Sequence, residues 1–148
     1  MTIGELIQKI KNGVAELKAN READVLIIAN NQIALVSLRI QSRGEDADGS
    51  PFIPYTPDYA KTRKAAGYQI GFVDFTRTGR TLASVKARIT ASSIFSASVV
   101  IEPDNDESKA IVKGLSNKRG DILALSQDEL LIIKAANRRR INKYFDGI

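Results

Sequence analysis

The segment Thr76-Arg-Thr-Gly-Arg-Thr81 has the residue types of a phosphate-binding turn, because a glycine allows close backbone approach and two arginines flank it. It lacks the glycine spacing and following lysine of a P-loop, and it lacks the three-glycine fingerprint of a dinucleotide-binding fold. We therefore interpret Thr78, Gly79 and Arg80 as a structural turn that leads into a strand.

Carboxylates cluster between residues 45 and 48 and again between residues 104 and 107, but neither cluster has the spacing of a calcium-binding loop. The chain has no histidine and no cysteine, so the commonest general base, imidazole and thiolate metal ligands, and cysteine nucleophiles are excluded. No serine lies in a Gly-x-Ser-x-Gly elbow. We predict a protein that is not an enzyme, with no catalytic residue, no metal and no cofactor. An unrecognised hydrolase is the weakest of the hypotheses.

Basic residues gather near the C-terminus in a stretch that contains no acid: Lys134, Arg138, Arg139, Arg140 and Lys143. The whole chain has 22 Lys and Arg against 17 Asp and Glu, a formal charge of +5. Two interpretations stay open. In the first, these cations lie in a solvated last helical turn and complement the helix dipole. In the second, they form a charged interface for phosphates or an acidic partner.

The N-terminal third has helical periodicity. Thr2 and Glu5 have the spacing of a capping box, and apolar residues then recur at helical intervals up to about Lys18. The pattern restarts near Asn20 and ends near Gly44. We predict a second helix there, which either pairs with the first as a hairpin or continues it after a kink.

Residues 43–57 cannot form a helix, because three prolines interrupt them. We predict an extended loop or arm, and aromatic side chains between the prolines favour a role for this arm in contacting a neighbouring subunit. Its expected interface residues are Pro51, Phe52, Ile53, Pro54 and Tyr55.

The middle of the chain predicts short elements: a helix over 58–66, an antiparallel strand pair over 81–90 and 93–101, a helix over 108–115 and an apolar strand over 121–125. Ser126 and Glu129 form a second capping box. The final helix reaches about residue 145, and its apolar face is expected to contain Leu130, Ile133, Ile141 and Tyr144.

Together these patterns predict one α+β domain over residues 1–148, with N-terminal helices, a proline-rich arm, a small antiparallel sheet and a C-terminal helix packed on the sheet. The first residues do not have the pattern of a signal peptide, and the most apolar stretch is interrupted by polar residues. We expect no membrane association.

Three elements occur in an order that resembles phage virion-morphogenesis and tail-completion proteins. They are Gly49-Ser-Pro-Phe-Ile-Pro54, then Phe75-Thr-Arg-Thr-Gly-Arg-Thr-Leu82, then Lys118-Arg-Gly-Asp-Ile-Leu-Ala-Leu-Ser-Gln-Asp-Glu129. The resemblance covers about residues 40–145. Phe52 stands where that family often has tryptophan, and the Thr-Gly element is one residue longer than its minimal form.

This resemblance implies a structural subunit of a phage virion, made in the host cytoplasm. It implies a homo-oligomeric ring, often six-fold or twelve-fold, at the neck or tail terminus, where it serves tail completion or head-tail joining. The implied partners are connector, portal-side or tail proteins, with packaged DNA as a further candidate in the channel. The alternative that stays open is a small basic nucleic-acid-binding protein that acts through its C-terminal helix.

Overall fold

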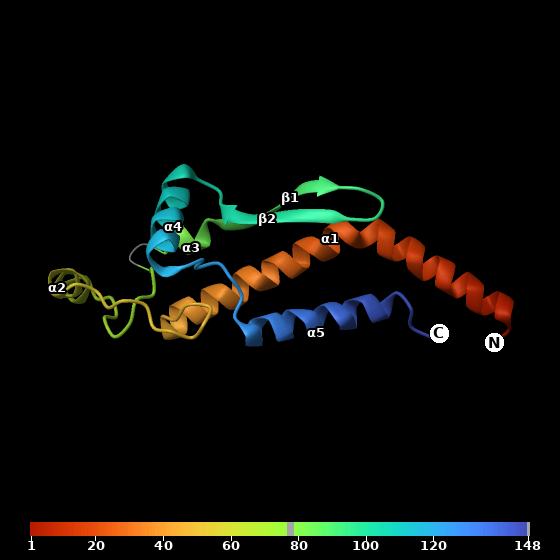
Figure 1. Cartoon of the computed structure of the whole chain (residues 1–148), viewed down its shortest axis with the longest axis horizontal. Coiled ribbons are helices and arrows are strands. Elements are labelled where there is room, and N and C mark those ends of the chain that lie inside the picture. Colours follow the sequence, from red (N-terminus) through yellow and green to blue (C-terminus); the bar gives the residue numbers. More distant parts are fainter. Residues whose placement is uncertain (77–78, 148) are drawn as a thin grey trace.

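The computed structural model describes residues 1–76 and 79–147 and shows an elongated molecule built around one long helix (Figure 1). The elements in chain order are α1 (Ile3–Arg43), α2 (Pro57–Ala65), α3 (Arg80–Ala83), β1 (Val85–Ser92), β2 (Ala97–Pro103), α4 (Asp106–Arg119) and α5 (Gln127–Lys143). Helices at both ends of the chain and a two-stranded antiparallel sheet between them confirm the predicted α+β class.

Helix α1 is a single helix of 41 residues, so the hairpin alternative is wrong and the second helical pattern continues the first. The expected capping box is present, with the Thr2 hydroxyl accepting from the Glu5 backbone. The chain bends partway along α1 (Figure 1). Near this bend the Asn20 side chain donates to the Glu16 carbonyl, so the expected helix break at Asn20 becomes a change of direction without a loop.

Gly44 ends α1 in the left-handed conformation, with φ of 65°. A Cβ at this position would lie 2.7 Å from the Phe72 ring and 2.9 Å from the Val73 carbonyl oxygen. Both the backbone angle and the lack of space therefore require glycine at the point where the chain leaves the helix.

Strands β1 and β2 form an antiparallel hairpin, with Val85 opposite Pro103 and an irregularity between Ile89 and Ala91. Both strands lie further along the chain than predicted, because Arg80–Ala83 forms the short helix α3 and the connection between the strands extends to Ser96. The hairpin tip lies over the bend of α1 (Figure 1). There the Arg21 guanidinium donates to the Ser92 hydroxyl at 3.2 Å.

Helix α5 lies along α1, on the side of α1 opposite the hairpin (Figure 1). The hairpin, α1 and α5 thus form three layers, and the expectation that the C-terminal helix packs on the sheet is wrong. The Ser126 and Glu129 capping box at the start of α5 is confirmed.

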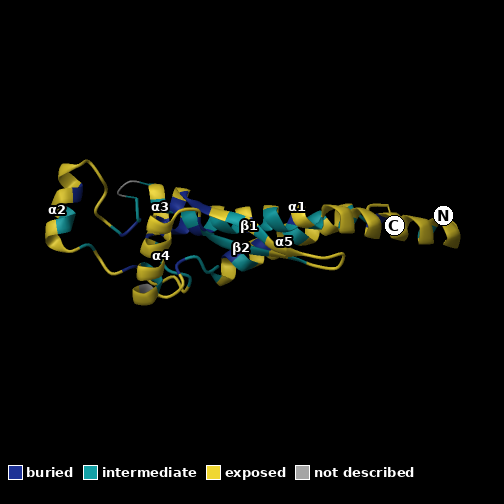
Figure 2. Cartoon of the chain, turned by 90° about the horizontal axis from the view of Figure 1, so that it is seen from above, coloured by how far each residue is buried: buried dark blue, intermediate teal, exposed yellow. Residues whose placement is uncertain are grey.

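The core lies where the C-terminal half of α1 meets the segments after it, and Figure 2 shows buried residues concentrated there. It contains Val36, Ile40, Phe52, Val73, Leu82 and Ile122. Residues 121–125 do not form the predicted strand. They form a turn and an extended connection that places Ile122 in the core at 1% exposure, which explains their apolar character.

Candidate assembly surfaces and buried polar networks

The N-terminal part of α1 carries an exposed apolar stripe. Ile3, Ile7, Ile10 and Val14 are 78%, 48%, 43% and 37% exposed. Their spacings of four, three and four residues, followed by Leu17, are those of the a and d positions of a heptad repeat. Isolated surface apolar residues are ordinary, but a continuous stripe indicates an interaction site. We call Ile3, Ile7, Ile10, Val14 and Leu17 the N-terminal stripe.

The C-terminal segment covers the neighbouring face of this same part of α1. Lys9 donates to the Gly147 carbonyl at 2.7 Å. Gly13 is buried, and a Cβ there would lie 2.3 Å from the Tyr144 carbonyl oxygen and 2.8 Å from the Phe145 ring. The C-terminal segment thus packs tightly beside the N-terminal stripe and leaves its first four residues exposed, whereas Leu17 is half-buried.

Helix α5 carries a second exposed apolar surface near its start. Leu131 and Ile132 are 63% and 54% exposed, whereas Ile133 is buried. Asp128 lies on the same exposed side, one helical turn before them. We call Asp128, Leu131 and Ile132 the α5 patch.

The predicted apolar face of α5 is only partly correct. Ile133 is buried and Leu130 and Tyr144 are half-buried, but Ile141 is 37% exposed. The side of α5 that meets α1 instead uses polar contacts. The Tyr144 hydroxyl donates to the buried Asp24 at 2.7 Å, and Arg140 contacts the same carboxylate at 3.3 Å.

The four cations of the predicted charged interface are therefore divided between two roles. Arg140 forms the ion pair with Asp24 and holds α5 to α1. Arg138, Arg139 and Lys143 are exposed. Within residues 1–76 and 79–147, no carboxylate forms an ion pair with these three.

The proline-rich arm folds back onto its own chain. Phe52 is 5% exposed and lies in the core, with its ring centre 4.9 Å from that of Phe75. A bridge between Glu45 and Pro51 turns the chain so that this ring points inward. The expectation that the arm exposes Phe52 is wrong. Ile53 is 66% exposed, and Pro51 and Pro54 also lie at the surface.

The expected structural turn opens a helix. Gly79 has φ of 66° and precedes α3, and Arg80 is the first residue of α3 and pairs with Glu107 at 3.9 Å. Thr78 lies outside the described residues. The strand that the turn was expected to open begins at Val85.

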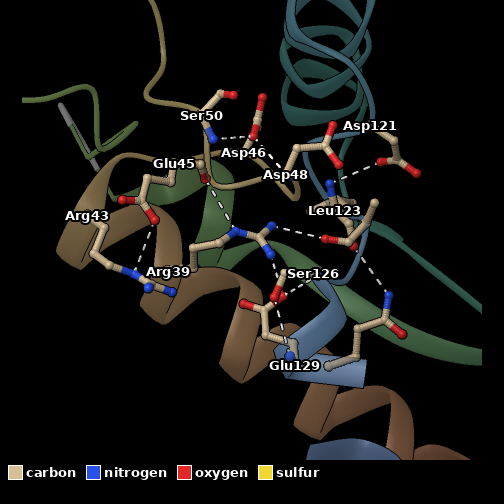
Figure 3. A network of polar contacts seen from close by, with 12 residues as sticks. Arg39, Arg43, Glu45, Asp46, Asp48, Ser50, Asp121, Leu123, Ser126 and Glu129 are labelled. Carbon is tan, nitrogen blue, oxygen red and sulfur yellow. Dashed lines mark hydrogen bonds and ion pairs between the residues drawn. The ribbon is translucent and has the colours of Figure 1, made fainter. Parts of the chain in front are cut away.

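A buried arginine joins four segments near the start of α5 (Figure 3). Arg39 is 2% exposed and forms an ion pair with the buried Glu129. Its other nitrogens donate to the Glu45 carbonyl at 3.3 Å and the Ala124 carbonyl at 3.0 Å. Glu129 also accepts from the Ser126 backbone at 2.8 Å. One guanidinium thus connects α1, the arm, the segment before α5 and α5 itself.

A second buried ion pair organises the lobe that contains α2. The Arg63 guanidinium lies 3.0 Å from Asp74 and 4.5 Å from the centre of the Tyr55 ring. Burial raises the pKa of Asp74, but hydrogen bonds from Thr76, Gln69 and Tyr55 outweigh burial and lower this pKa from 3.8 to about 2. Asp74 is therefore ionised at neutral pH and stays paired with Arg63.

Neither buried pair has the features of a catalytic site. Both arginines are almost completely buried and donate their hydrogen bonds to groups inside the protein, so a substrate cannot reach them. A polar concavity does lie beside α5, lined by Glu45, Asp46, Asp48 and Asp128 among others. Within the described part of the chain, no group of carboxylates is arranged to hold a metal ion.

Helix α1 has the length and apolar composition of a helix that crosses a membrane, the only described helix that does. Core helices of soluble proteins also have this length and composition. Helix α1 carries the buried Asp24 and Arg39 and packs between the hairpin and α5 along part of its length.

Comparison of the chain with protein-family models, with curated proteins and with solved structures gives no match.

Proposed function

We propose that this protein is a non-enzymatic structural subunit that assembles with copies of itself into a closed ring at the neck or tail terminus of a phage particle. The phage location comes from the resemblance of the three sequence elements. The observation that carries the assembly function is the presence of two different exposed apolar surfaces, the N-terminal stripe and the α5 patch, on one chain.

The two surfaces lie apart along the long axis of the molecule (Figure 1). A two-fold dimer uses the same surface on both subunits, whereas a contact between two different surfaces repeats from one copy to the next. Such a head-to-tail contact gives a ring when the rotation closes and a filament when it does not. Two unlike surfaces on an elongated chain therefore support a ring of several copies.

The test is the mass of the purified chain in solution, measured by light scattering, together with the symmetry of the particles in electron micrographs. We expect a species of six or twelve times the 16.2 kDa chain mass. Particles of open, unlimited length would show that the chain forms a filament instead of a ring. A chain that stays monomeric at every soluble concentration would contradict the proposed self-assembly.

A second candidate function is nucleic-acid binding by the exposed cations of α5. Arg138, Arg139 and Lys143 are exposed, and three phosphate contacts of this kind give affinity that falls steeply with salt. Oligonucleotide binding is measured by fluorescence anisotropy across a salt series for a variant with Arg138→Ala and Arg139→Ala. The control variant carries Lys86→Ala and Lys113→Ala. Under our leading proposal, the two variants bind oligonucleotide equally weakly. Steeply salt-dependent binding that only the arginine variant loses would favour the second candidate.

A further inference from the structure

The N-terminal stripe needs a partner that is apolar at its centre and acidic at one edge. Lys11 and Lys18 occupy the positions that follow the stripe residues Ile10 and Leu17 around the helix, so they form a basic edge along the stripe. Lys18 Nζ lies 5.5 Å from the centre of the Phe95 ring of the same chain, so Lys11 is the cation of this edge that faces a partner. The opposite edge has the uncharged Leu6, Gly13 and Asn20, and the C-terminal segment covers it at Gly13. An ion pair with a partner is therefore available on one edge only.

Pairing of the stripe with the same stripe of a second copy does not meet this need. In an antiparallel pair the two basic edges face each other, and in a parallel pair the basic edge faces the uncharged edge. The stripe is also only about two heptads long, shorter than the three to four heptads typical of a coiled coil. The charges thus disfavour an antiparallel pair and give a parallel pair no ion pair, so a different surface with acidic groups is the favoured partner.

The α5 patch has the complementary properties. Leu131 and Ile132 provide exposed apolar side chains, and Asp128 provides a negative charge beside them. The concavity next to Asp128 is lined by Glu45, Asp46 and Asp48 and also by Arg39 and Arg43, so acidic groups outnumber basic ones beside the patch. A basic edge on one surface and an acidic edge on the other also fix the orientation of docking.

We infer that the N-terminal stripe of one copy docks on the α5 patch of the next copy, with Lys11 facing Asp128 and the acidic loop of residues 45–48. This inference rests on the proposed function, because it specifies the contact that repeats around the ring. It also assigns a role to the part of α1 that projects beyond the body of the molecule (Figure 2).

Cross-linking tests this contact directly, because the chain has no cysteine and any introduced thiol is unique. Purified Lys11→Cys and Asp128→Cys chains are mixed and treated with a short bismaleimide. We expect a covalent dimer from this mixture. A mixture of Lys11→Cys with Lys113→Cys, a surface position on α4, is the control and should stay uncoupled.

Substitutions on each surface then separate assembly from folding. We expect Ile10→Asp and Ile132→Asp to weaken self-association by about 30-fold or more, the ratio that corresponds to a hot-spot loss of about 2 kcal/mol. Ile111→Asp is the matched control, because Ile111 on α4 is 42% exposed and Ile10 is 43% exposed. All three variants should unfold at the wild-type urea midpoint.

Charge reversal gives the strictest test. We expect Lys11→Glu and Asp128→Lys each to weaken association by about five-fold, which corresponds to an exposed ion pair of about 1 kcal/mol. The double variant carries both reversed charges and should regain wild-type association, which a folding defect in either single variant cannot explain.

The outcomes distinguish this contact from the proposed function. If the wild-type chain forms rings but gives no Lys11 to Asp128 cross-link, and Ile10→Asp assembles normally, the inferred contact is wrong and the ring proposal stands. If the wild-type chain is monomeric, both are wrong.

Discussion

Replacing Arg39 by alanine is expected to lower the free energy of unfolding by about 3–5 kcal/mol, because Glu129 would then be a buried carboxylate without its cation. The variant also loses the hydrogen bonds to the Glu45 and Ala124 carbonyls, so the arm and the start of α5 lose their shared anchor (Figure 3). Urea unfolding followed by circular dichroism measures this loss.

Arg43→Ala is the matched control, because Arg43 lies one turn later in α1 and pairs with Glu45 at the surface. An exposed pair contributes about 0–1 kcal/mol, so the control should unfold almost like the wild type. Replacing both buried partners, with Arg39→Met and Glu129→Leu, should recover part of the lost stability, since no unpaired charge remains. Equal losses for Arg39→Ala and Arg43→Ala would contradict the role of the buried pair.

The second large effect is expected in the α2 lobe, where Arg63→Ala should lower the free energy of local opening by about 3–5 kcal/mol. The substitution leaves Asp74 buried at 4% exposure without its cation, and it removes the guanidinium from the Tyr55 ring. Hydrogen exchange of residues 57–74 measures the effect. Lys61→Ala on the same helix removes only an exposed pair with Asp58 and serves as the control.

The same site gives a pH dependence with a defined sign. The pKa of Asp74 in the folded chain is about 2, below its ordinary value of 3.8, so the folded state binds its proton less readily than the unfolded state. The resulting stabilisation is present above about pH 4 and is lost as the pH falls towards 2, by roughly 2–3 kcal/mol. Asp74→Asn should remove this pH dependence from the exchange of residues 57–74. An unchanged pH profile in that variant would show that another carboxyl group is responsible.

Local patterns predicted the helix starts well, because a capping box depends on residues only three apart. Thr2 with Glu5 and Ser126 with Glu129 both begin helices as expected. The continuation of the helix through Asn20 was not predictable in the same way. Asparagine only weakly disfavours a helix, and here α1 continues between two packed layers that no local pattern could show.

Long-range contacts account for the other differences. Phe52 was expected at an exposed interface because prolines surround it, but the bridge between Glu45 and Pro51 turns it into the core. Ile141 fits the helical period of α5, yet α5 meets α1 through Arg140 and Tyr144 around Asp24, a residue more than one hundred positions away in the sequence.

The buried arginines were missed entirely, because a charged residue in a helical pattern is normally at the surface. Arg39 lies 90 residues from Glu129 in the sequence. Only the capping box with Ser126 indicated that the Glu129 carboxylate has a structural role. The exposed assembly surfaces were also missed. The apolar residues from Ile3 to Leu17 were correctly predicted as one helical face, but their exposure depends on where the C-terminal segment packs.

The mass of the wild-type chain in solution, compared with that of Ile10→Asp, tests the proposed self-assembly most directly. Light scattering should find a closed species of six or twelve chains for the wild type and a folded monomer for the variant, because the N-terminal stripe forms half of the repeating contact. A wild-type chain that is monomeric at every soluble concentration would contradict the proposal that this protein assembles with itself.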